Sequence, residues 1–218
     1  MLFSSTYFVY LFLPAVLLAY HSLRLTAGIG AARYLLIVAS LFFYGWWNPT
    51  YIALILASIG VNYSLGRALA GQLALPMSGK PLLTVGVLFN LGLLGYYKYS
   101  GFVVGFVSGL FLDYPIMLDV ILPLAISFFT FQQIAFLVDV YRDKSIMNET
   151  TLEKYLCFVL FFPQLIAGPI VHHRQLVPQL ASESLNSVTL RHLQLGLAIF
   201  LLGLFKNCLL YTSDAADD

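Results

Sequence analysis

Long apolar runs alternate with short polar intervals along most of the chain. The first run covers residues 1–20, and two more, Tyr34–Trp47 and Tyr51–Leu65, are separated only by Asn48-Pro49-Thr50. A connection this short predicts a tight helical hairpin, because Pro49 disfavours helical geometry at the residue before it. Between the first two runs, the interval His21–Arg33 is rich in glycine and alanine and predicts a polar hinge.

Five further apolar runs follow, and one of them is short. A helix needs about 20 residues to cross the hydrocarbon, and Gly101–Leu112 falls well below that length. It is expected to be a tilted continuation of the preceding helix, a half-helix or a re-entrant element. The fold class is therefore all-α, a polytopic transmembrane helical protein with about 6–8 membrane segments that include short or re-entrant helices. The five runs are Leu82–Tyr97, Gly101–Leu112, Val120–Val140, Tyr155–Val171 and Val188–Leu210.

Composition supports residence in a membrane. Hydrophobic residues make up 60% of the chain and charged residues only 10%, with a mean hydropathy of +0.87. Since soluble domains carry about 25% charged residues, this chain has no surface suited to water and is expected to face lipid. The net charge of +1 offers no basic patch for nucleic acid. Cys157 and Cys208 both lie in apolar runs and are expected to be buried thiols, without disulfide or zinc-ligand spacing.

The few cations predict the orientation of the chain. The intervals Arg24–Arg33 and Arg67–Lys80 are basic, whereas the turn at Asn48-Pro49 has no charge. The positive-inside rule places the two basic intervals on the cytoplasmic side and the Trp46-Trp47 turn outside. The first apolar run has neither a preceding cation nor a small-residue cleavage site, so it is expected to remain as an uncleaved span.

The last eight residues differ from the rest of the chain. Three of the ten acidic residues fall in the final five positions, directly after an apolar run. We expect residues 1–210 to form one membrane domain. Residues 211–218 are an acidic tail, either native or, as we prefer, a foreign junction sequence.

Polar side chains within one apolar run are candidates for function. Ser127, Thr130 and Gln133 are spaced by three residues and so share one helix face, with Gln132 beside them. Such residues either join one span to another by interhelical hydrogen bonds or line a polar channel. Both interpretations stay open at this point.

A second candidate is the segment from Phe161 to Arg174, in which Pro163 and Pro169 bracket Gly168. A continuous helix is unfavourable there. Irregular backbone at membrane depth is tolerated only where protein buries it or where it lines a cavity, so this segment predicts a functional pocket. His172 and His173 at its end are either a base or, as we favour, interfacial anchors.

Three segments taken in order resemble the membrane-bound O-acyltransferase family, in its branch of alginate and peptidoglycan O-acetyltransferases. They are Leu41–Pro49, Leu122–Gln133 running on to Val138–Arg142, and Phe162–Pro169. The resemblance implies many transmembrane helices around a central funnel, where an acyl group from a cytoplasmic thioester meets an acceptor hydroxyl. It also implies an intramembrane histidine that acts as general base. The residues expected to line the substrate channel are Gln132, Gln133, Gln164, Gly168, Pro169 and His172.

The resemblance further implies O-acetyl transfer to a cell-envelope polysaccharide such as alginate or peptidoglycan. The donor would be acetyl-CoA or another acyl thioester, with no bound cofactor and no metal. The expected surroundings are lipid of the bacterial inner membrane, where the chain is multi-pass, and an extracytoplasmic acetyltransferase partner.

No catalytic residue is carried over, because the histidine of the family lies in a later segment than the end of this sequence. None of the four histidines occupies that place, and this chain alone is expected to be inactive. The histidines are His21, His172, His173 and His192.

Two other classes of protein stay open. A transporter or channel would also contain broken helices near mid-membrane, but repeat-built transporters show interruptions in two related halves. Here the glycine and proline interruption is concentrated once. A non-catalytic membrane scaffold is the third interpretation.

Overall fold

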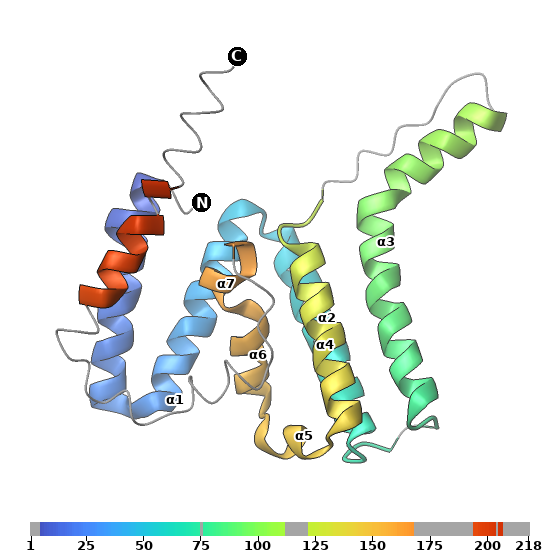
Figure 1. Cartoon of the computed structure of the whole chain (residues 1–218), viewed down its shortest axis with the longest axis horizontal. Coiled ribbons are helices and arrows are strands. Elements are labelled where there is room, and N and C mark those ends of the chain that lie inside the picture. Colours follow the sequence, from blue (N-terminus) through green and yellow to red (C-terminus); the bar gives the residue numbers. More distant parts are fainter. Residues whose placement is uncertain (1–4, 75, 112–121, 168–193, 204, 207–218) are drawn as a thin grey trace. The chain divides into compact units, whose positions relative to one another are not determined.

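A computed structural model describes residues 5–74, 76–111, 122–167, 194–203 and 205–206 of the chain. These residues form helices joined by short turns, and no strand occurs among them (Figure 1). A further helical stretch covers Gln194–Gly203. The elements in chain order are η1 (Phe8–Phe12), α1 (Leu13–Trp47), α2 (Thr50–Leu69), α3 (Lys80–Phe111), α4 (Ile126–Arg142), α5 (Ser145–Glu149), α6 (Leu152–Leu160) and α7 (Phe162–Ala167).

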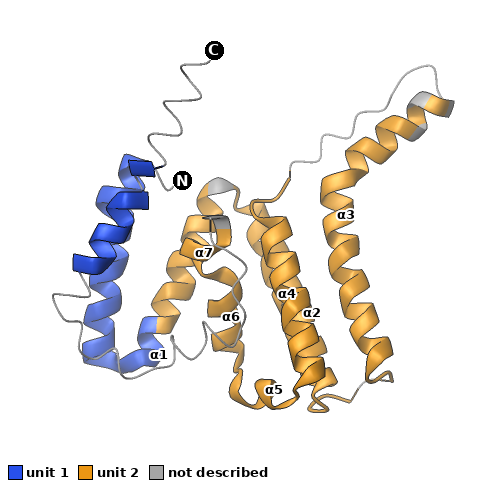
Figure 2. Ribbon diagram, in the orientation of Figure 1, with its two compact units in different colours: residues 1–32, 181–218 blue, residues 33–180 orange. Residues whose placement is uncertain are grey.

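The chain divides into two compact units, Met1–Ala32 with Ala181–Asp218, and Arg33–Leu180 (Figure 2). Helix α1 is broken at Gly28, whose dihedrals are φ 86° and ψ 176°. A positive φ of this size suits glycine because it has no Cβ. The predicted polar hinge over His21–Arg33 is therefore present only at Gly28. The rest of that interval is helical.

The predicted hairpin at Asn48-Pro49-Thr50 is confirmed. Helix α1 ends at Trp47 and α2 begins at Thr50. The Asn48 side chain accepts a hydrogen bond from the Thr50 N–H at 3.0 Å, so it satisfies one of the backbone donors that a helix start leaves free. The two helices also approach closely, since a Cβ added at Gly45 would lie 2.7 Å from Cδ1 of Ile52.

The short apolar run Gly101–Leu112 is part of helix α3 as far as Phe111, where that helix ends. This stretch continues α3 without interruption, so the predicted continuation of the preceding helix is confirmed and the separate half-helix or re-entrant element is wrong for the described residues. Its tilt in a membrane stays a prediction. The 32 residues of α3 make about 48 Å of helix at 1.5 Å per residue. That length exceeds the hydrocarbon thickness of about 30 Å.

Helix α4 starts later than the apolar run predicts. The expected span began at Val120, but the helix begins at Ile126, after Ala125 in a left-handed conformation (φ 57°, ψ 21°). Pro123 disfavours helical geometry at Leu122, and the positive φ at Ala125 turns the chain into the helix. The correction leaves α4 with 17 residues.

Two described helices are long and apolar enough to cross a membrane. They are the helical stretch Phe8–Trp46, with 39 residues and the break at Gly28 inside it, and Thr50–Leu69, with 20 residues. The larger number of membrane segments stays a prediction.

The core of the second unit lies where α2, α3, α4 and α6 pack together. Figure 1 shows α4 alongside α2, and the rings of Phe136 and Tyr155 lie 4.4 Å apart where α4 meets α6. Two glycines allow the close packing. A Cβ at Gly66 would lie 2.9 Å from Cε1 of Phe136, and one at Gly86 would lie 2.7 Å from Cδ1 of Leu137.

Candidate functional site

The predicted interruption at Pro163 is present as a break between α6 and α7. Helix α6 ends at Leu160 and α7 begins at Phe162. Phe161 between them has φ −50° and ψ 101°, outside the helical region. Pro163 cannot donate a backbone hydrogen bond, which disfavours a continuous helix through this point.

The backbone groups at this break are bonded by side chains from two other helices. The Phe158 carbonyl accepts a hydrogen bond from Nε2 of Gln132 on α4 at 2.9 Å. The Phe162 N–H donates to Oγ of Ser40 on α1 at 3.2 Å. Both side chains are buried, with 1% of Ser40 and 6% of Gln132 exposed. Interior partners of this kind are what a broken helix needs where no water can reach the backbone.

A chain of buried polar side chains crosses the same unit. Asn62 on α2 and Asn90 on α3 each donate an amide hydrogen to the other's side-chain oxygen, at 3.2 and 2.6 Å. Nε2 of Gln133 on α4 donates to Oγ of Ser58 on α2 at 3.1 Å. The Tyr155 hydroxyl on α6 donates to Oε1 of Gln133 at 3.4 Å. We call these five residues the amide chain, and it connects four helices.

The structure places only part of the predicted channel lining. Gln132 and Gln133 are buried and make the interhelical hydrogen bonds described above, which is the first of the two interpretations left open for them. Gln164 lies half-buried on α7. Gly168, Pro169 and His172 lie outside the described residues, and the channel itself stays a prediction.

The polar face predicted on α4 is partly buried. Thr130 and Gln133 are fully buried, whereas Ser127 is half-buried. The Thr130 hydroxyl has no hydrogen-bond partner, nor has the buried hydroxyl of Tyr44 on α1.

Sequence reasoning missed Ser40, Asn62, Asn90 and Tyr155. One signal could have found the two asparagines. Each is a lone amide within an apolar run, and an amide facing hydrocarbon is costly enough that it must find a partner.

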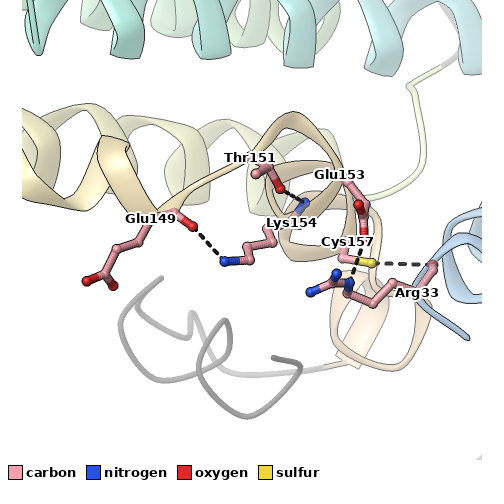
Figure 3. A network of polar contacts seen from close by, with 6 residues as sticks. All are labelled: Arg33, Glu149, Thr151, Glu153, Lys154 and Cys157. Carbon is pink, nitrogen blue, oxygen red and sulfur yellow. Dashed lines mark hydrogen bonds and ion pairs between the residues drawn. The ribbon is translucent and has the colours of Figure 1, made fainter. Parts of the chain in front are cut away.

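A group of charged and polar residues surrounds the start of α6 (Figure 3). The Arg33 guanidinium on α1 pairs with the Glu153 carboxylate at 2.5 Å. The Cys157 thiol donates to the Arg33 carbonyl at 3.6 Å, and its predicted burial is confirmed. Thr151 caps the helix by accepting from the Lys154 N–H at 3.4 Å. This end of α6 is thereby tied to α1.

The loop after α2 lies at the same end of the unit as α5. Nε2 of Gln72 donates to Oδ1 of Asn148 at 3.0 Å. The basic interval Arg67–Lys80 and the charged interval Arg142–Lys154 are therefore neighbours. Among the described residues, no group of three His, Cys, Asp or Glu side chains is placed to hold a metal ion.

Comparisons with known proteins give relatives of one kind. The chain is 38% identical to a peptidoglycan O-acetyltransferase of Helicobacter pylori. The alignment, 240 positions long with gaps, covers 99% of this chain and 45% of that protein. It is 34% identical to a probable alginate O-acetylase AlgI of Azotobacter vinelandii, over 82% of this chain and 36% of that protein. A probable alginate O-acetylase AlgI of Pseudomonas aeruginosa is 32% identical, with 82% and 34% covered.

The chain thus spans less than half the length of these curated relatives. No protein-family model matches it, and no solved structure matches it. The apolar helices and the relatives agree in making it a membrane protein. Because the likeness extends over most of the chain, the chain is homologous to the peptidoglycan O-acetyltransferase and the alginate O-acetylases, which are membrane-bound O-acyltransferases.

Proposed function

We propose that the chain forms part of a membrane-embedded O-acetyltransferase that acts on a cell-envelope polysaccharide such as peptidoglycan or alginate. The observation that carries this proposal is the 38% identity to a peptidoglycan O-acetyltransferase over 99% of the chain. The alginate O-acetylases match over 82% of the chain and support the same class of reaction.

In this reaction a hydroxyl oxygen of the acceptor attacks the carbonyl carbon of an acetyl thioester. The new C–O bond forms as the C–S bond breaks, the hydroxyl proton passes to a general base, and the sulfur leaves as a thiolate, which takes up that proton to become the free thiol. A dry site favours the transfer because water would otherwise hydrolyse the thioester. No described residue is assigned as the base.

The described residues contribute the protein wall of such a site. After the α6–α7 break, Gln164 lies on the short helix α7. The first hydrogen bonds of this helix are accepted by the Phe161 carbonyl. We propose that Gln132, Gln133, Gln164, Gly168, Pro169 and His172 line the path of the substrate. The polar atoms of Gln132 and Gln133 that bond neighbouring helices then hold this wall together.

The wider setting is also part of the proposal. The donor is acetyl-CoA or another acyl thioester that arrives from the cytoplasm, and no cofactor stays bound. The protein crosses the bacterial inner membrane several times and works with an extracytoplasmic acetyltransferase partner. The basic residues of the intervals Arg24–Arg33 and Arg67–Lys80 support placing these two intervals on the cytoplasmic side.

Deletion of the gene in its source bacterium tests the proposal. Acetate released by mild alkali from purified peptidoglycan and from extracellular polysaccharide is measured in wild type, deletion strain and complemented strain. We expect the deletion to lower ester-bound acetate in one of these polymers and complementation to restore it. Unchanged acetate in every envelope polymer would contradict the proposal.

A further inference from the structure

The two backbone groups bonded by Ser40 and Gln132 lie four residues apart, which is the spacing of a helical hydrogen bond. A continuous α-helix joins each N–H to the carbonyl four residues earlier. The Phe162 N–H and the Phe158 carbonyl are such a pair, but Ser40 takes the first and Gln132 takes the second. Each half of one missing helical hydrogen bond is therefore satisfied by a side chain from a different helix.

Pro163 by itself does not account for this opening. A proline removes its own N–H and crowds the carbonyl four residues earlier, which here belongs to Val159. It leaves the bond between Phe162 and Phe158 possible. The separation of that pair at Phe161 thus needs something beyond the proline, and the two buried side chains provide it.

We propose that Ser40 and Gln132 are positioning residues that hold the α6–α7 break open and thereby set the direction of α7. The N–H groups of Gln164 and Leu165 both donate to the Phe161 carbonyl at 3.0 Å, so α7 starts from the break and not from α6. The orientation of Gln164 follows from this start. Only the catalytic relevance of Gln164 rests on the proposed function.

The surroundings keep the two side chains in place. Ser40 lies on α1, which contacts α7 through the rings of Phe43 and Phe162 at 5.5 Å. Gln132 lies on α4 beside Gln133, which the amide chain ties to α2 and α6. If the Ser40 hydroxyl and the Gln132 amide did not bond the backbone at the break, both would be buried without these hydrogen bonds. That would cost free energy of folding.

The test compares single and double variants in the full-length protein in detergent. Hydrogen–deuterium exchange is followed in peptides that cover residues 158–165 of Ser40→Ala, Gln132→Met and the double variant. Ser40→Ala leaves the Phe162 N–H without its acceptor, and Gln132→Met removes the donor that braces the Phe158 carbonyl, so we expect the amides of these peptides to exchange about tenfold faster in each single variant. In the double variant the Phe162 N–H can bond the Phe158 carbonyl, so we expect exchange within about twofold of wild type.

Acetyl transfer by the same variants separates positioning from mere stability. The double variant should regain protection but keep a kcat lowered by at least about tenfold, because its break is closed and Gln164 is displaced. A purely structural role would restore protection and kcat together, and that result would overturn the proposal. So would wild-type exchange in the single variants, or exchange in the double variant as fast as in either single.

Matched controls remove a serine and a glutamine hydrogen bond elsewhere. Ser64 donates to the Gly60 carbonyl and Gln72 to Asn148. Ser64→Ala and Gln72→Met should leave exchange in residues 158–165 unchanged, and an equal rise there would overturn the proposal. If Ser40→Ala does not fold, Ser40→Cys replaces it, because a thiol is a weaker acceptor. Its exchange should lie above wild type, and an unchanged rate would overturn the proposal.

Hydrogen exchange and acetyl transfer test two different claims. If wild-type protein transfers no acetyl group, the proposed function fails, while the exchange pattern still decides whether the two residues hold the break open.

Discussion

The side-chain amides of Asn62 and Asn90 form a reciprocal pair between α2 and α3, with donor–acceptor distances of 2.6 and 3.2 Å. Each amide nitrogen also donates to its own helix, to the Ser58 carbonyl at 2.9 Å and to the Gly86 carbonyl at 2.8 Å. Both side chains have no exposed surface. Two amides that satisfy each other this fully fix the axial register of α2 against α3, since a shift of either helix would leave both unpaired.

A double-mutant cycle on this pair should show strong coupling. Asn62→Ala or Asn90→Ala leaves a buried amide without its partner and is expected to cost about 1–3 kcal/mol of stability. The double variant should cost less than the sum of the singles by about 0.5–2 kcal/mol. Unfolding in mixed detergent micelles measures the three changes. Costs that simply add would show that the pair is not an energetic unit.

Two glycines on α2 should respond oppositely to alanine. A Cβ at Gly66 meets the Phe136 ring at 2.9 Å, whereas one at Gly60 meets nothing within 4 Å. We expect Gly66→Ala to destabilise the protein by about 1–3 kcal/mol through overpacking. Gly60→Ala is the matched control and should be neutral or stabilise by up to about 1 kcal/mol. Thermal melting of the two variants side by side decides the point, and equal melting temperatures would contradict the packing of α2 against α4.

Swapping the two charged residues of the ion pair at the start of α6 should restore only part of the stability that is lost when either charge is removed. Arg33 and Glu153 are 14% and 19% exposed, so loss of either charge by Arg33→Met or Glu153→Gln should cost about 1–3 kcal/mol. The swap Arg33→Glu with Glu153→Arg restores the pair. It also places a cation near the positive end of the α6 dipole, which opposes full recovery.

Lys154→Met is the control for the ion pair, because Lys154 is half-buried and its ammonium donates to the Glu149 carbonyl, outside the ion pair. It should change stability by less than about 0.5 kcal/mol. Chemical denaturation measures all four variants. A swap no more stable than the worse single variant would contradict the pairing of α1 with α6.

The loops at the two ends of α2 should lie on opposite sides of the membrane. Gln72→Cys and Asn148→Cys should react with a membrane-impermeant thiol reagent only from the cytoplasmic side, and together they should form a disulfide on oxidation. Asn48→Cys should react only from outside. Labelling of right-side-out and inverted vesicles measures this. Reaction of Asn48→Cys and Gln72→Cys from the same side would contradict the predicted orientation.

What the sequence could predict was mostly local. The hairpin follows from Pro49 and the shortness of its connection, and Pro163 indicates that the apolar run Tyr155–Val171 is interrupted. In both places a proline restricts the neighbouring backbone whatever surrounds it. The start of α4 could be predicted only in part. Pro123 disfavours helical geometry at Leu122, but Leu122–Ala125 is otherwise as apolar as the helix after it, and the positive φ at Ala125 leaves no mark in the pattern.

The polar partners of the site depend on which helices become neighbours. Gln132 and Gln133 stood out because two adjacent amides in an apolar run are unusual. Their bonds to Phe158 and Ser58 needed the packing of α4 against α6 and α2. Ser40 gave no signal, since a serine in a helix ordinarily bonds its own backbone or packs against a neighbour.

Acetyl transfer by the full-length protein in lipid vesicles is the decisive measurement for the proposed O-acetyltransferase activity. Labelled acetyl-CoA or an acetylated carrier thioester is supplied on one side, with peptidoglycan fragments, alginate and the extracytoplasmic partner on the other. We expect protein-dependent ester-linked acetate on one of these glycans, with kcat reduced in the Ser40→Ala, Gln132→Met double variant. Glycan acetate no greater than in protein-free vesicles, with every donor and acceptor supplied, would contradict the proposed activity.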